Sequence, residues 1–411
     1  MKLKGFQKLT LVDEALQIWF SAMQLGKPKV ISVRLQDALG RVLAEDLVAL
    51  EDLPRFDKSA MDGYAVRSFD LAGASQPKPA VLQLTQGDYV EAKQAKQIWT
   101  GNPLPEGADA VVMLENTQKR DDRLEVWSQL NPWTNVSEVG EDVKKGTVVF
   151  KAGTRLNPYH IGLAAALGHT ELKVANKPKV AILPTGNELA ELGTERGANQ
   201  IYDSNKVMVS AMCHELGAET VDLGLAKDKT EEIAKKIQSA LEKFDAVITT
   251  GGTSVGGLDL VPDAVNMLGK PGVVVHGVAL RPAMPTAVAV LEGKPVLILS
   301  GNPVAAVIGF EVFGRPLITK MLGMEKAEPR TVVKAVLSRR VTSVLGRKTY
   351  VRVRVLLKNN ELSAEPISAK GSGSISTMTQ SNGYMIVPEN REGVNEGETV
   401  LIHMFDSLEI S

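Results

Sequence analysis

The stretch Ala246-Val247-Ile248-Thr249-Thr250-Gly251-Gly252 decides the fold, because a strand-length apolar run leads directly into a glycine turn. The same succession occurs at residues 180–183 before Thr185-Gly186-Asn187 and at residues 296–299 before Gly301-Asn302-Pro303. Helix-length segments separate these runs. Strands that alternate with helices predict an α/β domain with a parallel sheet covered by helices. Such sheets bind ligands at the carboxyl ends of their strands, where these glycine turns lie.

The remaining sequence divides around this α/β region. Residues 1–45 and 141–176 have mostly helical patterning, whereas the proline-rich stretch between them consists of short apolar runs typical of β structure. Polar and apolar residues alternate with period two over residues 350–355, as in a half-exposed strand. We therefore predict an α/β multidomain chain: a helical domain (1–45 plus 141–176) interrupted by a β-rich insertion (46–140), an α/β domain (177–328) and a small C-terminal β domain (329–411).

The composition excludes several classes of protein. Lys plus Arg is 47 and Asp plus Glu is 48, so the net charge of -1 gives no support to a protein that binds nucleic acid through its phosphates. The single cysteine, Cys213, excludes a disulfide framework and a multi-cysteine metal site, and we expect it in the core. No apolar run reaches the length of a membrane span. We expect a cytoplasmic protein that binds neither nucleic acid nor membrane.

The glycine turns are candidate phosphate sites. Glycine lets backbone N–H groups approach an anion, and a following helix adds its dipole. The turns match neither the P-loop nor the dinucleotide fingerprint. For any one turn, a purely structural role as a tight strand–helix connection is equally acceptable. Three such turns in one domain, with hydroxyl groups at Thr185, Thr253 and Ser254, favour phosphate binding.

Four carboxylates stand beside these turns, namely Glu188, Asp203, Asp228 and Asp259. Next to a bound phosphate they are unfavourable unless a cation intervenes, and Mg²⁺ with oxygen ligands is the usual solution. Two of them also have plainer interpretations. Asp203 before Ser204 fits a helix N-cap, and Asp228 fits a solvated loop charge.

Further motifs, in order along the chain, complete a pattern that covers residues 8 to 405. They lie at residues 56–67, 100–103, 107–112, 140–143, 184–189, 201–205, 250–259, 281–282 and 301–304. Each one is weak alone, but together they closely resemble the MoeA family, the molybdopterin molybdenumtransferases, whose animal relatives include the C-terminal domain of gephyrin.

The resemblance implies an enzyme of molybdenum cofactor biosynthesis. Members of the family insert molybdate into adenylylated molybdopterin, with Mg²⁺-dependent cleavage that releases AMP. The resemblance also implies a homodimer, with a cleft between the α/β domain of one subunit and the β-rich domain of the other. The adenylylating enzyme of the same pathway is a further candidate partner.

The same resemblance assigns roles to individual residues. The implied catalytic residues are Asp62, Thr100, Asp142 and Glu188, and the implied metal ligands are Glu188, Asp228 and Asp259. The residues implied to bind the pterin nucleotide or the oxyanion are Thr185, Gly186, Asp203, Ser204, Gly251, Gly252, Ser254, Arg281, Asn302, Pro303, Arg352 and Ser372. Guanidinium groups suit bidentate contact with an oxyanion, which supports the two arginines.

Three positions depart from the family pattern. Met284 stands where the family commonly has the lysine of Gly-Lys-Pro, Ser300 replaces a proline, and Gly257 replaces an often acidic residue. These departures leave open a divergent paralog that binds pterin or acts as a scaffold with weak or no catalysis. A pyrophosphatase of another nucleotide is a third alternative, because glycine turns and carboxylates alone do not specify a pterin. The metal-inserting enzyme is favoured, because the motif carboxylates occur together.

Overall fold

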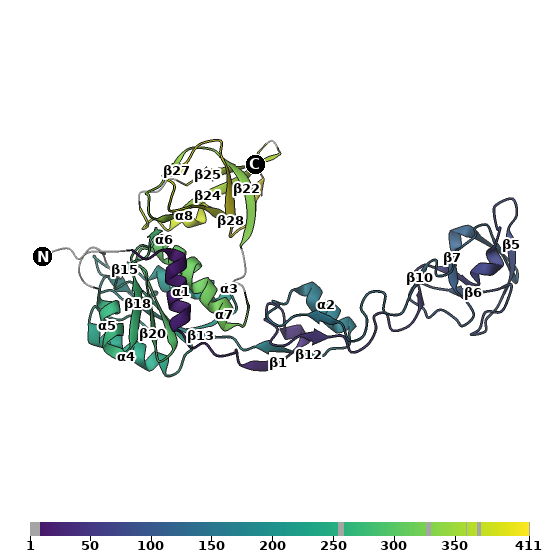
Figure 1. Ribbon diagram of the computed structural model, residues 1–411, viewed down its shortest axis with the longest axis horizontal. Coiled ribbons are helices and arrows are strands. Elements are labelled where there is room, and N and C mark those ends of the chain that lie inside the picture. Colours follow the sequence, from purple (N-terminus) through teal and green to yellow (C-terminus); the bar gives the residue numbers. More distant parts are fainter. Residues whose placement is uncertain (1–8, 254–258, 326–329, 359, 368–370, 411) are drawn as a thin grey trace. The chain divides into compact units, whose positions relative to one another are not determined.

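The computed structural model describes residues 9–253, 259–325, 330–358, 360–367 and 371–410 (Figure 1). The chain divides into two compact units, one of residues 1–31 with 175–411 and the other of residues 32–174. Within the described residues, no helix is long and apolar enough to cross a membrane.

A six-stranded sheet forms the centre of the first unit. Its strands, in spatial order, are β16 (Glu219–Asp222), β13 (Lys179–Pro184), β17 (Ala246–Thr250), β21 (Lys294–Leu299), β20 (Ala287–Leu291) and β18 (Pro271–His276). The first four are parallel, but β20 pairs antiparallel with both β21 and β18, so β20 is reversed and the sheet is mixed and not purely parallel as predicted. The reason is a two-residue hairpin between β20 and β21, in which Glu292 and Gly293 both have positive φ, at 51° and 76°.

Helices cover both faces of this sheet. On one face α4 (Thr230–Leu241) and α5 (Leu260–Leu268) bury Ile233, Ile237 and Val265 against the strands. Figure 1 shows α1, α3 and α7 on the other side. The elements of that side are α1 (Val12–Ala22), α3 (Ser204–Glu215), α6 (Pro303–Gly309), the π turn η4 (Phe310–Gly314) and α7 (Arg315–Met321).

The N-terminal helix belongs to this unit by its contacts. Trp19 of α1 is fully buried and donates its Nε1–H to the carbonyl oxygen of Ala289 at 2.9 Å. Its ring also contacts Phe313 of η4 edge-on, with centroids 6.1 Å apart. The contacts thus group α1 with the α/β sheet, whereas the sequence pattern predicted residues 1–45 to form one domain with residues 141–176.

The C-terminal β region is a closed five-stranded barrel. Its strands are β22 (Thr331–Leu337), β24 (Lys348–Lys358), β25 (Glu361–Pro366), β26 (Gly383–Val387) and β28 (Thr399–Met404). They pair in the order β24-β25-β22-β28-β26, and β26 pairs with β24 again, which closes the ring. Two short strands, β19 (Leu280–Arg281) and β29 (Glu409–Ile410), also pair with β24. The short helix α8 (Ser376–Thr379) precedes β26, and β23 (Val341–Thr342) pairs with β27 (Gly393–Val394).

The second unit contains the predicted β-rich insertion as a six-stranded sheet. In spatial order its strands are β7 (Ala110–Met113), β4 (Gly63–Val66), β6 (Gln94–Ile98), β5 (Ala80–Leu84), β9 (Arg123–Val126) and β8 (Thr117–Arg120). Tyr64, Leu82 and Leu124 are buried in its core.

The segments that flank this insertion are less helical than predicted. Their one α-helix in the second unit is α2 (Pro158–Ala166), which begins with a reciprocal capping box between Asn157 and His160. The flanking segments also contain the 3-10 turn Leu35–Asp37 and the strand pair β1 (Val30–Arg34) with β12 (Glu171–Ala175). Their strand β11 (Val148–Phe150) pairs with β2 (Leu47–Val48) of the insertion, and β3 (Lys58–Ser59) pairs with β10 (Val136–Ser137) within the insertion. The prediction of helix over residues 1–45 is therefore wrong beyond α1.

Candidate functional site

The three glycine turns lie side by side at the carboxyl edge of the parallel strands. The N–H of Thr185, directly after β13, donates to the carbonyl oxygen of Thr250 at 2.9 Å. The N–H of Gly251, directly after β17, donates to the carbonyl oxygen of Leu299 at 3.0 Å. The Cα of Gly251 also lies only 3.5 Å from where a Cβ on Gly301 would stand. This edge is where the sequence predicts a ligand site.

Glycine is required at the second turn for two reasons. Gly251 and Gly252 have φ of +88° and +65°, in the left-handed region that favours glycine. A Cβ on Gly251 would stand 2.4 Å from the carbonyl oxygen of Thr185, and one on Gly252 would stand 2.6 Å from the Thr185 hydroxyl. That hydroxyl is buried and has no hydrogen-bond partner in the described part of the chain. An unpaired buried hydroxyl beside close-packed backbone is a ready donor for a ligand oxygen.

The first turn of α3 forms a hydrogen bond with the third glycine turn. The Oδ1 of Asp203 accepts a hydrogen bond from the N–H of Lys206 at 3.1 Å, which confirms the N-cap interpretation of Asp203. Asp203 is buried, and this burial raises the pKa of its carboxyl group. The Nδ2 of Asn205 donates to the carbonyl oxygen of Gly301 at 2.7 Å. Ser204 is exposed beside them.

A cleft of about 430 Å³ adjoins the third turn, and residues of the barrel form part of its wall. It brings together Arg281, Asn302, Arg352 and Ser372, four of the residues implied by the family resemblance. It also contains Arg347, which was not predicted from the sequence. Arg347 stands in the turn before β24, five positions ahead of Arg352, and its position after Gly346 at the start of the period-two strand was the available signal.

The cleft is cationic and its charge is not balanced. Among the described residues, no carboxylate forms an ion pair with Arg281, Arg347 or Arg352. The Nε of Arg352 is buried without a hydrogen-bond partner in the same part of the chain, and burial lowers the pKa of this guanidinium group. Arginine nevertheless stays charged at neutral pH. Arg281 is exposed and Arg347 is half-buried, so Arg352 is the desolvated cation of the cleft. A partly desolvated cation without a carboxylate partner favours binding of an anion.

Backbone contacts hold the walls of this cleft in place. Arg281 pairs with Thr349 in the register of β19 and β24, so the α/β segment and the barrel share a strand pairing. The N–H of Val304 in α6 donates to the carbonyl oxygen of Ser372 at 3.1 Å. The hydroxyl of Thr253 donates to the carbonyl oxygen of Pro285 at 3.0 Å, which links the second glycine turn to the cleft. The cleft and the glycine turns are therefore contiguous.

The predicted metal ligands do not form a closed cluster. Glu188 is exposed, and the Oδ2 of Asp228 accepts the N–H of Asn187 at 3.2 Å. Asp259 lies 3.7 Å from the Nε2 of His276. No group of three His, Cys, Asp or Glu residues in the described ranges could hold a metal ion. The structure thus does not bring Glu188, Asp228 and Asp259 together.

The other predicted catalytic residues lie in the second unit. The Oδ1 of Asp62 accepts hydrogen bonds from the N–H of Thr100 at 2.8 Å and from its hydroxyl at 2.7 Å. These two bonds lower the pKa of Asp62. Asp142 is exposed, and its N–H donates to the carbonyl oxygen of Leu53 at 3.1 Å. Ser254, a predicted ligand contact, and Gly257 lie outside the described residues.

Comparison with known proteins accounts for nearly the whole chain. Residues 10–168 match the MoeA N-terminal region (domain I and II), residues 181–320 a probable molybdopterin binding domain, and residues 334–405 the MoeA C-terminal region (domain IV). A putative molybdopterin biosynthesis protein of Methanocaldococcus jannaschii is 40% identical over 92% of both chains. A molybdopterin molybdenumtransferase of Staphylococcus aureus is 35% identical over 93% of both. The crystal structure of a Pyrococcus horikoshii molybdopterin biosynthesis moeA protein superposes with a TM-score of 0.83 at 31% identity, covering 97% of this chain and 100% of that one.

Proposed function

This chain belongs to the MoeA family and acts in molybdenum cofactor biosynthesis as a molybdopterin molybdenumtransferase, and we propose that it inserts molybdate into adenylylated molybdopterin with Mg²⁺-dependent cleavage that releases AMP. The observation that carries this proposal is the cationic cleft. Molybdate is a tetrahedral dianion, and three guanidinium groups without carboxylate partners in the described residues attract its negative charge and donate hydrogen bonds to its oxygen atoms. Ser372 adds a hydroxyl at the same cleft.

The glycine turns are the proposed site for the phosphates of the pterin nucleotide. The unpaired hydroxyl of Thr185 and the backbone N–H of Gly252 are the available donors. The N–H groups of Gly186 and Gly251 already donate to the carbonyl oxygens of Ala226 and Leu299, at 3.2 and 3.0 Å, so these two glycines contribute close approach to the ligand. Asn302 belongs to the third turn and also lines the cleft. The proposed phosphate site and the proposed oxyanion site therefore form one continuous surface. This continuity supports the proposal, because transfer of the metal requires both substrates to be held next to each other.

The carboxylates beside the turns suit Mg²⁺ as a partner of those phosphates. Mg²⁺ is normally held by one or two carboxylates with phosphate oxygens and water, so a cluster of three protein ligands is not needed. We propose that one or two of the three residues Glu188, Asp228 and Asp259 supply these carboxylates. The bound ion would neutralise the phosphates and polarise the phosphorus. Asp62, Thr100 and Asp142 remain proposed catalytic residues of the second unit.

Met284 is the feature that favours the alternative, a divergent paralog with weak or no catalysis. It lines the cleft with an apolar thioether, so this position contributes no positive charge to anion binding. Arg347 supplies a cation to the same cleft and therefore offsets this loss. We propose on this ground that the cleft still binds the oxyanion.

Single-turnover conversion of adenylylated molybdopterin tests the function. The protein is mixed with the substrate and Mg²⁺, with and without molybdate, and AMP and metal-bound product are followed. We expect molybdate-dependent AMP release, reduced at least tenfold in R352Q because one desolvated guanidinium is removed. The matched control is R391Q, which removes an exposed arginine paired with Glu398 at 2.9 Å elsewhere on the barrel. Binding without AMP release in the parent protein would establish the paralog instead.

Three further proposals rest on the family alone. We propose that the protein works as a homodimer, that it receives its substrate from the adenylylating enzyme of the pathway, and that it does so in the cytoplasm. Sedimentation of the purified chain tests the first, and co-elution with the adenylylating enzyme tests the second.

A further inference from the structure

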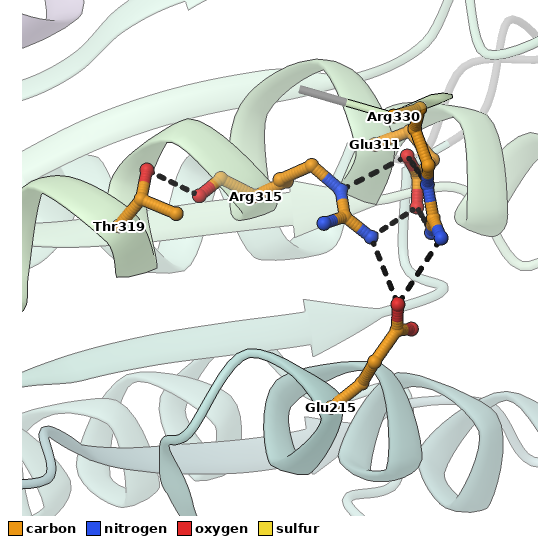
Figure 2. Close-up of polar contacts among 5 residues, drawn as sticks. All are labelled: Glu215, Glu311, Arg315, Thr319 and Arg330. Atoms are coloured by element: carbon orange, nitrogen blue, oxygen red, sulfur yellow. Dashed lines mark hydrogen bonds and ion pairs between the residues drawn. The ribbon is translucent and has the colours of Figure 1, made fainter. Parts of the chain in front are cut away.

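Two arginines and two glutamates form a cluster, in which Glu311, Arg315 and Arg330 have largely buried side chains and Glu215 is half exposed (Figure 2). The carboxylate of Glu311 accepts two hydrogen bonds from Arg315, at 3.1 and 3.3 Å, and two from Arg330, at 3.2 and 2.6 Å. Both guanidiniums also reach Glu215 Oε1, at 3.4 and 3.1 Å. The Glu311 side chain is only 4% exposed. Two positive charges therefore meet two negative ones, in contrast with the unbalanced cleft.

The members of this cluster come from both sides of the contact. Glu311 lies in the π turn η4, and η4 continues α6, which begins at Pro303 next to the third glycine turn. Arg330 directly precedes β22, the first strand of the barrel. Its two hydrogen bonds to Glu311 fix the planar guanidinium in one orientation, which a single contact would not do. The pair thus joins the helix that follows a site loop to the start of the barrel.

A row of aromatic residues leads from the cluster to the cleft. Tyr384 pairs with Arg352 across β26 and β24, and with His403 across β26 and β28. Its ring stacks on His403 with centroids 5.2 Å apart and contacts the ring of Tyr350 at 5.3 Å. Burial raises the pKa of Tyr384 to about 12, with a further contribution from the charge of Glu311. Tyr350 and Arg352 both line the cleft.

We infer that Glu311 and Arg330 are positioning residues, which hold the barrel face that carries Tyr350 and Arg352 against the helices and thereby set the width of the oxyanion cleft. Neither residue lines the cleft. A buried, bidentate ion pair contributes orientation more than net stability, because desolvation offsets most of its attraction. The predicted effect on oxyanion affinity rests on the proposed function, whereas the positioning of the barrel against the helices does not.

Two measurements on the full-length protein test this inference. In the first, nitroxide labels on V207C in α3 and L401C in β28 report the distance between helices and barrel by pulsed electron resonance. Both positions are about half exposed, and Cys213 is buried, so it does not take up the label. We expect a narrow distance distribution in the parent, a broadened one in R330Q and a narrow one in the control R391Q. An unchanged distribution in R330Q overturns the inference.

In the second measurement, sodium molybdate is titrated into the same proteins by calorimetry. Loss of coupling through a packed network changes affinity on the order of tenfold, so R330Q should bind about tenfold more weakly than the parent, and R391Q should match it. R330K keeps the charge but not the bidentate contact, so it should lie between them and also serves if R330Q fails to fold. Equal affinity of the parent, R330Q and R330K overturns the inference. If the parent binds no molybdate, the proposed function fails, and the label distances still decide the positioning role.

Discussion

Substitution of Gly251 by alanine should show how closely the first two glycine turns pack. The added Cβ costs about 1–2 kcal/mol because φ is +88°. It would also stand 2.4 Å from the carbonyl oxygen of Thr185, and overpacking of this kind costs about 1–3 kcal/mol more. Gly217 is the matched control, since its φ is +94° but the nearest atom, Cδ1 of Leu322, is 3.9 Å away. We expect a loss of about 2–5 kcal/mol for G251A and about 1–2 kcal/mol for G217A.

Urea unfolding followed by Trp19 fluorescence measures this difference in the first unit alone. Trp19 is the sole tryptophan of that unit. The three tryptophans of the other unit, replaced by phenylalanine in the background protein, are Trp99, Trp127 and Trp133. Equal shifts of the urea midpoint in G251A and G217A would refute the reasoning, because the close approach to Thr185 would then contribute nothing.

Three other predictions concern the same unit. Burial raises the pKa of Glu311, but the hydrogen bonds and charges of both arginines outweigh this and hold it below 4.5. The stabilisation by the Glu311 carboxylate is therefore present above its unfolded-state pKa and is lost as the pH falls. In urea unfolding, E311Q should lower the free energy of unfolding by about 3–5 kcal/mol at pH 7 and by less below pH 4.5. A loss that does not depend on pH would contradict this. Burial raises the pKa of Cys213 to about 12, so a disulfide reagent should modify it only as the unit unfolds in urea; rapid labelling of the folded protein would disprove its burial. N205A removes the 2.7 Å hydrogen bond to the carbonyl oxygen of Gly301 and should lower the free energy of unfolding by about 1–2 kcal/mol. Amide hydrogen exchange at residues 300–302 should become faster, and unchanged exchange would contradict a role of this bond in holding the third turn.

Much of the first unit could be predicted from local patterns. A strand that ends in a glycine turn can be predicted from a window of about ten residues. The neighbouring strands β13, β17 and β21 then bring three such turns to the carboxyl edge of the sheet. The reversal at β20 was missed because an apolar run does not reveal its direction. Its signal was the pair Glu292-Gly293 in a two-residue turn, and it is weaker than the usual Asn-Gly.

The placement of α1 could not be predicted from periodicity. The apolar face of a helix indicates that it packs against something, but not against which sheet. Here the partner of Trp19 is Ala289, 270 residues further along the chain. The predicted helices over residues 30–45 failed for a related reason: β1 is largely exposed along its length, so no alternation marks it as a strand.

The site was predicted in part. Arg281 and Asn302 belong to the motifs of the family resemblance, Arg352 and Ser372 were candidates for holding the oxyanion or the pterin phosphate, and all four share one cleft. Arg347 was missed because a charged residue in a turn is ordinarily a solvated surface group. What distinguishes it is the lack of an acidic partner in the described residues around the cleft, and sequence does not show partners.

The second unit is inserted between two adjoining points of the first. The chain leaves the first unit at residue 31 and returns at residue 175, and the N–H of Asn176 donates to the carbonyl oxygen of Lys29 at 2.7 Å. A short turn could join these ends without disturbing the sheet, since insertions with adjoining ends can be removed or exchanged at little cost. We therefore expect the α/β sheet and barrel to fold as a separate protein when residues 32–174 are replaced by such a turn or by the same region of a relative.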